Sequence, residues 1–141
     1  MNDATTVCAK VQMYLLAGIN ECTPVTTTLW YDSTDPFAVR LLIEIEDSTY
    51  ADWVFARDLL ERGMHGSAGH GDVRVWPAPR DRSETRISLA GVGLESNYVQ
   101  AIFTARSADL HDFLACTYDL VAAGAEEINF ERELTHLLAD G

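Results

Sequence analysis

Apolar and polar residues alternate along several segments of this chain. In residues 7–16 and 39–45, every second residue is apolar, and most residues between them are polar or charged. A period of two is typical of a strand that buries one face and exposes the other. Residues 24–31 are rich in β-branched and aromatic side chains, which favour the pleated surface of a sheet. The pattern therefore predicts three strands in the first third of the chain.

Shorter apolar runs predict the remaining strands. They fall at residues 52–55, 73–76, 86–89 and 98–105, and Pro77 ends the second of them. Proline cannot donate to the ladder of a sheet, so it commonly marks the end of a strand. With the three segments above, the chain has six or seven predicted strands.

The period changes to that of a helix at three places. Residues 56–62 form a short predicted helix that Gly63 ends, and residues 107–124 carry a long apolar stripe at helical spacing. A final helix is predicted from Asn129 to about residue 139. Strands first and helices last favour an α+β fold, an antiparallel β-sheet of six or seven strands with two C-terminal helices. The sequence shows no internal repeat or linker, so we predict a single domain over residues 1–141.

The composition narrows the class of protein. With 141 residues and 48% hydrophobic content, the chain is long enough to bury a core without a metal or a disulfide. The three widely spaced cysteines (Cys8, Cys22 and Cys116) are expected to be reduced thiols, and the first residues lack the pattern of a signal peptide. No apolar run approaches the roughly 20 residues of a membrane span. These features predict a cytoplasmic protein.

The charge of the chain weighs against nucleic acid as a partner. Ten Lys and Arg residues against 22 Asp and Glu residues give a formal net charge of −12. Such a surface repels phosphate groups at long range and offers few cations for counterion release. We therefore expect no nucleic-acid partner.

Three patterns invite a chemical interpretation, and each has a simpler structural one. The glycine-containing loop at residues 63–72 follows a helix and lacks the Gly-Lys-Ser/Thr ending of a phosphate-binding loop. His65 and His70 lack the four converging ligands of a zinc site. Asp32 and Asp35 flank a turn, where aspartate commonly accepts hydrogen bonds from its own backbone. We predict no catalytic residue, no cofactor-binding residue and no metal ligand.

Trp53, Arg57, Arg74 and Trp76 are the candidates for a protein interface. Tryptophan and arginine dominate interface hot spots because they bury a large area and still offer directed hydrogen bonds. On a strand over residues 73–76, Trp76 takes the phase opposite the two valines. Its ring is expected to point toward a covering helix, a second subunit or a partner.

Four segments occur in a fixed order: YDSTDPFAV (31–39), WVFARDLL (53–60), GDVRVWP (71–77) and FERELTHLLA (130–139). Together they resemble the SsgA-like family of actinobacterial sporulation and cell-division regulators, and the resemblance spans most of the chain. It implies a Whirly-like topology, shared with single-strand-binding and guide-RNA-binding proteins. The chain departs from the family pattern in two places: its first strand and the loop over residues 17–23 are longer than expected, and Ser67 with Ala68 stand where a proline is expected. These departures leave the paralogue open.

The resemblance also implies a function. By this resemblance the protein is a non-enzymatic adaptor in septum-site selection; in the family, one member, aided by another, recruits the tubulin-like division protein FtsZ to future septum sites. We therefore expect a homo-oligomer, a trimer, with FtsZ and SsgA-like paralogues as partners at division septa. The alternative is a single-stranded nucleic-acid-binding protein of Whirly-like fold, which needs a basic groove with stacking aromatics.

Overall fold

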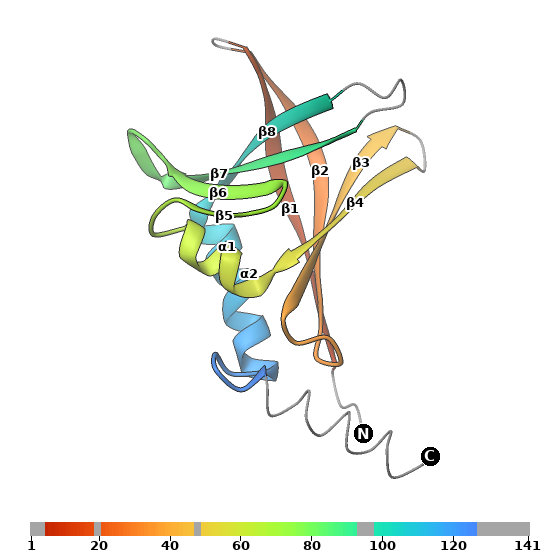
Figure 1. Ribbon diagram of the computed structural model, residues 1–141, viewed down its shortest axis with the longest axis vertical. Coiled ribbons are helices and arrows are strands. Elements are labelled where there is room, and N and C mark those ends of the chain that lie inside the picture. Colours follow the sequence, from red (N-terminus) through yellow and green to blue (C-terminus); the bar gives the residue numbers. More distant parts are fainter. Residues whose placement is uncertain (1–4, 19–20, 47–48, 93–97, 127–141) are drawn as a thin grey trace.

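In the described part of the chain, eight antiparallel strands form one curled sheet with two helices against it (Figure 1). The computed structural model describes residues 5–18, 21–46, 49–92 and 98–126. The order across the sheet is β4-β3-β2-β1-β8-β7-β6-β5. Along the chain the elements are β1 (Thr6–Gly18), β2 (Glu21–Asp32), β3 (Ala38–Glu46), β4 (Thr49–Ala56), α1 (Arg57–Gly63), β5 (Ala68–His70), β6 (Val73–Ala78), β7 (Asp81–Val92), β8 (Tyr98–Arg106) and α2 (Ser107–Leu120).

The chain passes twice through the same succession of elements. β1 to β4 form an antiparallel meander that continues into α1, and β5 to β8 form a second meander that continues into α2. The meanders join in the middle of the sheet, where Tyr14 of β1 pairs with Thr104 of β8. We call β1 to α1 the first half of the molecule and β5 to α2 the second half.

The prediction of an antiparallel α+β sheet is confirmed, but the prediction of six or seven strands is wrong. The additional strand, β5, lies inside the glycine-containing segment 63–72, and its Ala68 pairs with Val75 of β6. A turn at Gly71, whose φ is 61°, lets β5 fold back on β6. Three residues are too few to show a period of two, so the sequence pattern did not reveal this strand.

Two hairpins are also longer than the sequence predicted. β1 and β2 pair from Thr6 with Asp32 as far as Gly18 with Glu21, so both strands extend beyond the predicted residues 7–16 and 24–31. β7 begins at Asp81, well before the predicted residues 86–89. The added residues at these strand ends are mostly polar on both faces, so they show no apolar period of two that would predict a strand.

The hydrophobic core lies on the inner face of the sheet. Side chains of alternate strand residues reach it, among them the fully buried Met13, Leu29, Leu41, Val75 and Ile87. Helix α2 packs against β1, β7 and β8, whereas α1 packs against β4, β5 and β6. The predicted buried phase of the strands is therefore confirmed.

The helices partly follow the prediction. α1 ends at Gly63 and α2 begins at Ser107, as predicted, but α2 ends at Leu120 rather than near residue 124. The helix predicted from Asn129 lies outside the described residues. Neither α1 nor α2 is long and apolar enough to cross a bilayer.

Candidate protein-interaction surfaces

Arg57, a predicted interface residue, lies inside the molecule. It is the first residue of α1, and only 1% of its surface is exposed. Its Nη1 donates hydrogen bonds to the carbonyl oxygens of Thr117 (3.2 Å) and Val121 (2.7 Å), and its Nη2 pairs with the Glu126 carboxylate at 2.5 Å. The expectation of an exposed Arg57 is wrong, because this side chain binds the C-terminal end of α2 from within.

Two tyrosines complete the surroundings of Arg57. Its guanidinium carbon lies 5.0 Å from the ring centroid of Tyr31 and 4.4 Å from that of Tyr118, within the range of cation–π contacts. Burial raises the pKa of Tyr31 and of Tyr118, and the Arg57 charge partly offsets this in both. The Tyr31 hydroxyl donates to the Pro36 carbonyl at 3.0 Å. Arg57 thus has hydrogen-bond, ion-pair and cation–π partners inside the molecule, which fits a structural role.

The pKa of Glu126 reflects the same cluster. Partial burial alone raises the pKa of this carboxyl, but the hydrogen bond and charge of Arg57, with backbone N–H donors, outweigh it and hold the pKa below its ordinary value. One of these donors is the N–H of Gly124, at 2.9 Å. The ion pair with Arg57 therefore favours the ionised form of Glu126.

Trp53 belongs to the inner face rather than to an outer surface. It pairs with the buried Leu41 in the β3–β4 ladder and packs against the hydrophobic core. Its ring reaches across to β7, where a Cβ added at Gly91 would lie 3.4 Å from Cη2 of Trp53. Trp53 and Arg57 thus both lie on the inner side of the sheet, apart from the exposed Arg74.

Arg74 and Trp76 lie together on the outer face of β6. Val73 and Val75 are buried on the inner face, Arg74 is exposed and Trp76 is half-buried, so the predicted phase of Trp76 is confirmed. Both described helices pack against the inner face of the sheet, opposite to the outer phase of Trp76.

A row of outer-face residues runs from Trp76 across the sheet. Trp76 pairs with Arg86 of β7, Arg86 with Thr104 of β8, and Thr104 with Tyr14 of β1. Nε of Arg86 and Oγ1 of Thr104 are buried and have no hydrogen-bond partner among the described residues. We call Arg74, Trp76, Arg86 and Thr104 the second-half patch. Its arginines and tryptophan are the side chains that protein interfaces favour.

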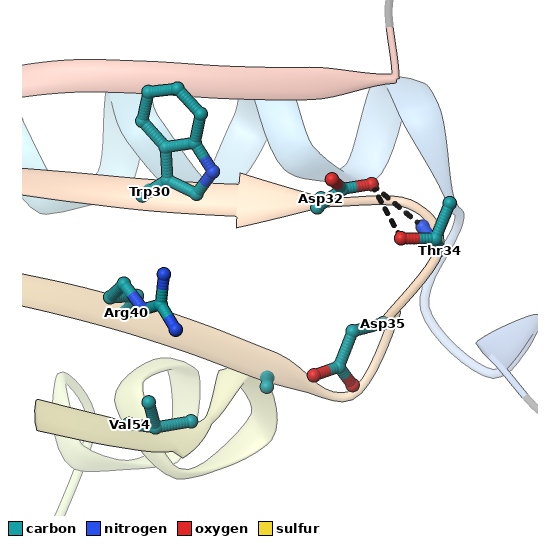
Figure 2. A pocket seen from close by; sticks show the side chains of 7 residues that line it. Trp30, Asp32, Thr34, Asp35, Arg40 and Val54 are labelled. Atoms are coloured by element: carbon teal, nitrogen blue, oxygen red, sulfur yellow. Dashed lines mark hydrogen bonds between the residues drawn. The ribbon is translucent and has the colours of Figure 1, made fainter.

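The sequence did not predict a second outer surface, in the first half. A hollow of about 230 Å³ opens there, and Figure 2 shows Trp30, Arg40 and Val54 on three neighbouring strands beside the turn that carries Asp32 and Asp35. Arg40 is opposite both Trp30 and Val54 in the ladders. Trp30 stands between Leu29 and Tyr31, so a continuous apolar run concealed its outward phase.

The turn beside this hollow has the structure that the sequence predicted. The backbone N–H and the hydroxyl of Thr34 both donate to Oδ1 of Asp32, each at 2.9 Å, and the N–H of Asp35 donates to the Asp32 carbonyl at 2.9 Å. Asp32 thus caps its own turn.

The described residues hold no group of three or more His, Cys, Asp and Glu side chains that could bind a metal ion. His65 and His70 are both exposed, and Nε2 of His65 lies 3.5 Å from a carboxylate oxygen of Glu61. Cys8, Cys22 and Cys116 are exposed and unpaired with one another.

Comparisons with known proteins agree with the predicted resemblance. Residues 25–126 match the family model described as Streptomyces sporulation and cell division protein, SsgA. The sporulation-specific cell division protein SsgB of Streptomyces coelicolor is 36% identical over 96% of this chain and 98% of its own length. SsgB of Thermobifida fusca is 34% identical over 98% of this chain and 99% of its own length.

Solved structures give the same result for the fold. A crystal structure of an SsgA-like sporulation-specific cell division protein from Thermobifida fusca has a TM-score of 0.81 and 31% sequence identity, and it covers 99% of this chain and 98% of that one. SsgB of Streptomyces coelicolor has a TM-score of 0.77 and 34% identity over 89% of this chain and 95% of that one.

Proposed function

Because this chain belongs to the SsgA family of sporulation and cell division proteins, we propose that it regulates sporulation-specific division by binding other proteins, without catalysis. The observation that carries the proposal is the outer face of the sheet. Arginine and tryptophan side chains gather there in the second-half patch, while both described helices pack on the inner face. Tryptophan and arginine are the side chains that most often dominate binding energy at protein interfaces.

The finer parts of the proposal come from the resemblance. We propose that the protein helps to select septum sites, that it recruits FtsZ together with SsgA-like paralogues, and that it does so at division septa. We also propose one domain over residues 1–141 and a homotrimer. Light scattering after size exclusion tests the trimer, and a mass near the monomer's 15.6 kDa at every concentration would contradict it.

Complementation of a deletion strain tests the function. Trp76→Ala and Arg74→Glu should each give a folded protein whose cells septate abnormally, because each removes an interface side chain without disturbing the core. Arg80→Glu is the matched control, since Arg80 is an exposed arginine beyond the end of β6. Circular dichroism checks that each variant is folded. Full rescue of septation by both folded patch variants would place the interface elsewhere. Turnover of a substrate by the purified protein would refute the non-enzymatic function.

The second candidate, single-stranded nucleic-acid binding on a Whirly-like topology, has weaker support. Arg74 and Arg86 give the second-half patch positive charge, but the whole chain carries a net charge of −12. Fluorescence anisotropy with a labelled single-stranded oligonucleotide should show no binding at physiological salt. Micromolar binding that weakens steeply with salt would make this candidate the leading one.

A further inference from the structure

The free edge of β4 has the backbone geometry of a docking site for an extended peptide. β4 is the last strand at one side of the sheet, and no described strand pairs with its outer side. The N–H of Arg57 donates to the Phe37 carbonyl at 2.7 Å, in the same register as the β3–β4 ladder. Hydrogen-bonded pairs alternate along an antiparallel ladder, so Phe55, Trp53 and Ala51 direct their backbone groups toward β3.

The residues between them direct their N–H and C=O groups toward the open edge. These residues are Tyr50, Asp52 and Val54, and the N–H of Ala56, the residue that caps α1, points the same way. Tyr50 and Val54 are also among the most exposed large apolar side chains, at 56% and 55%. Proteins commonly protect such an edge with lysine, proline or a covering element, and β4 contains neither lysine nor proline.

An apolar hollow adjoins the same edge. It has a volume of about 410 Å³ and lies between the end of β4 and the opposite side of the curled sheet at β5 and β6. Phe55, Leu59 and Val73 line it, and each of them is buried. A strand added beside β4 would direct alternate side chains to the inner face, next to this hollow.

The outer surface beside β4 is acidic. Asp32, Asp35, Glu44 and Asp52 lie there, and the nearby Arg40 is paired with Asp52, at 3.2 Å between Nε and Oδ1. On β4 itself the carboxylate is Asp52, which Arg40 already pairs with, so long basic side chains on an added strand would share Asp52 and extend to Glu44, opposite Tyr50 in the β3–β4 ladder. The whole chain, with its net charge of −12, attracts cations in the same way.

We infer that β4 binds an extended segment of a partner protein by strand addition, and that this segment alternates basic side chains on its outer face with branched apolar side chains on its inner face. The inference rests on the proposed function only in requiring a protein partner. It names a surface separate from the second-half patch, so one partner can occupy each.

The test uses the full-length protein and a labelled nine-residue peptide in which valine alternates with arginine or lysine. Fluorescence anisotropy at 150 mM salt measures binding, and amide hydrogen exchange followed by NMR locates it. Binding should slow exchange of the Tyr50, Asp52, Val54 and Ala56 amides at least tenfold. The same peptide with alternate backbone amides N-methylated on the β4 side should bind at least tenfold more weakly, because it keeps the charge but loses the ladder.

Substitutions in β4 test the same inference from the protein side, with a control variant at the same position. Val54→Pro removes one outward N–H, a change that an edge strand tolerates, and should weaken the peptide at least tenfold. Val54→Thr keeps the N–H and the β-branched shape and should bind as wild type does. If Val54→Pro does not fold, Asp52→Lys serves instead: it should weaken the basic peptide and admit a peptide with glutamate in place of arginine and lysine.

Three outcomes would overturn the inference. They are equal binding of the N-methylated peptide, protection of amides elsewhere in the sheet, and protection of the β4 edge amides in the protein alone. The last would mean that a second copy or another part of the chain already occupies the edge. None of these outcomes depends on septation in cells, and failure of the complementation test would leave the peptide result unchanged.

Discussion

The first and second halves of the molecule follow the same order of elements, yet they use the arginine at the junction of strand and helix differently. The residues that cap α1 and α2 have nearly the same backbone conformation, with φ and ψ of −68° and 138° at Ala56 and of −69° and 128° at Arg106. Arg57 follows its cap and points inward, whereas Arg106 is itself the cap and is exposed. A shift of one residue thus decides whether the arginine stabilises the core or faces solvent.

The outer faces of the two halves differ as well. In the first half, Trp30, Tyr50 and Val54 are exposed beside carboxylates. In the second half, Ser88 and Thr104 are buried on the outer face next to Arg86. The comparison shows that one backbone topology can carry two surfaces of opposite character, an acidic and apolar one beside β4 and a basic one beside β6.

The largest effect is expected at the buried arginine. Arg57→Ala leaves the Glu126 carboxylate and the carbonyls of Thr117 and Val121 without their donor, so it should lower the free energy of unfolding by about 3–5 kcal/mol. Arg106→Ala, the counterpart in the second half, should have little effect because Arg106 is exposed. Urea denaturation measures the free energy of unfolding of both variants. Equal losses in the two variants would remove the distinction between the halves.

The second largest loss of stability is expected where α1 of the first half contacts β6 of the second half. A Cβ added at Gly63, at the end of α1 in the first half, would overlap side-chain atoms of Val75 in β6 of the second half. Gly63→Ala should therefore lower the free energy of unfolding by about 1–3 kcal/mol. Gly66→Ala is the control, since a Cβ there meets nothing within 4 Å. A thermal melt of Gly63→Ala at the wild-type temperature would show that α1 moves freely on the second half.

Glu126→Gln should change how stability depends on pH. The folded pKa of Glu126 lies below its ordinary value of 4.5, so its ion pair stabilises the protein above that value and the contribution is lost as the pH falls through the folded pKa. Near neutral pH the free energy of unfolding of the variant should be about 1 kcal/mol lower than that of the wild type, and in acid the two values should be equal. Urea denaturation at pH 7 and at pH 3 measures this. If the free energies of unfolding of variant and wild type differ by the same amount at both pH values, the charge of Glu126 does not contribute to stability.

The smallest effect is expected for the exposed ion pair of the first half. The side chains of Arg40 and Asp52 are 52% and 48% exposed, so solvent screens their attraction. Arg40→Ala should change the free energy of unfolding by at most about 0.5 kcal/mol, and less at high salt. A loss as large as that of Arg57→Ala would mean that the outer face beside β4 is covered in solution.

Much of the fold was predictable because strand burial is a local property. A period of two in residues 7–16 and 39–45 predicted which side chains reach the core, and the same rule placed Trp76 on the outer face. β5 was not predictable, since three residues show no period and its pairing depends on the turn at Gly71. The duplicated topology left only a short trace in the sequence, the Ala-Arg pair at each strand–helix junction.

The candidate surfaces were less predictable than the fold. Arginine is rarely buried unless it is paired, and the groups that pair with Arg57 lie 60, 64 and 69 residues further along the chain. Nothing local to Arg57 identifies Thr117, Val121 or Glu126 as its partners. Trp30 was missed for a different reason, because the apolar residues on both sides of it conceal its phase.

The sequence by itself determined the secondary structure classes, the inner and outer phase of most strands, and membership of a family. These properties follow from periodicity and from segments that are contiguous in the chain. Only the tertiary structure decided that Arg57 is internal, that Trp53 reaches Gly91 across the inner face, and that β4 is an open edge. The alternation of side chains specifies the face of a strand but not its neighbours, because neighbours depend on how the whole sheet curls and where its ladder ends.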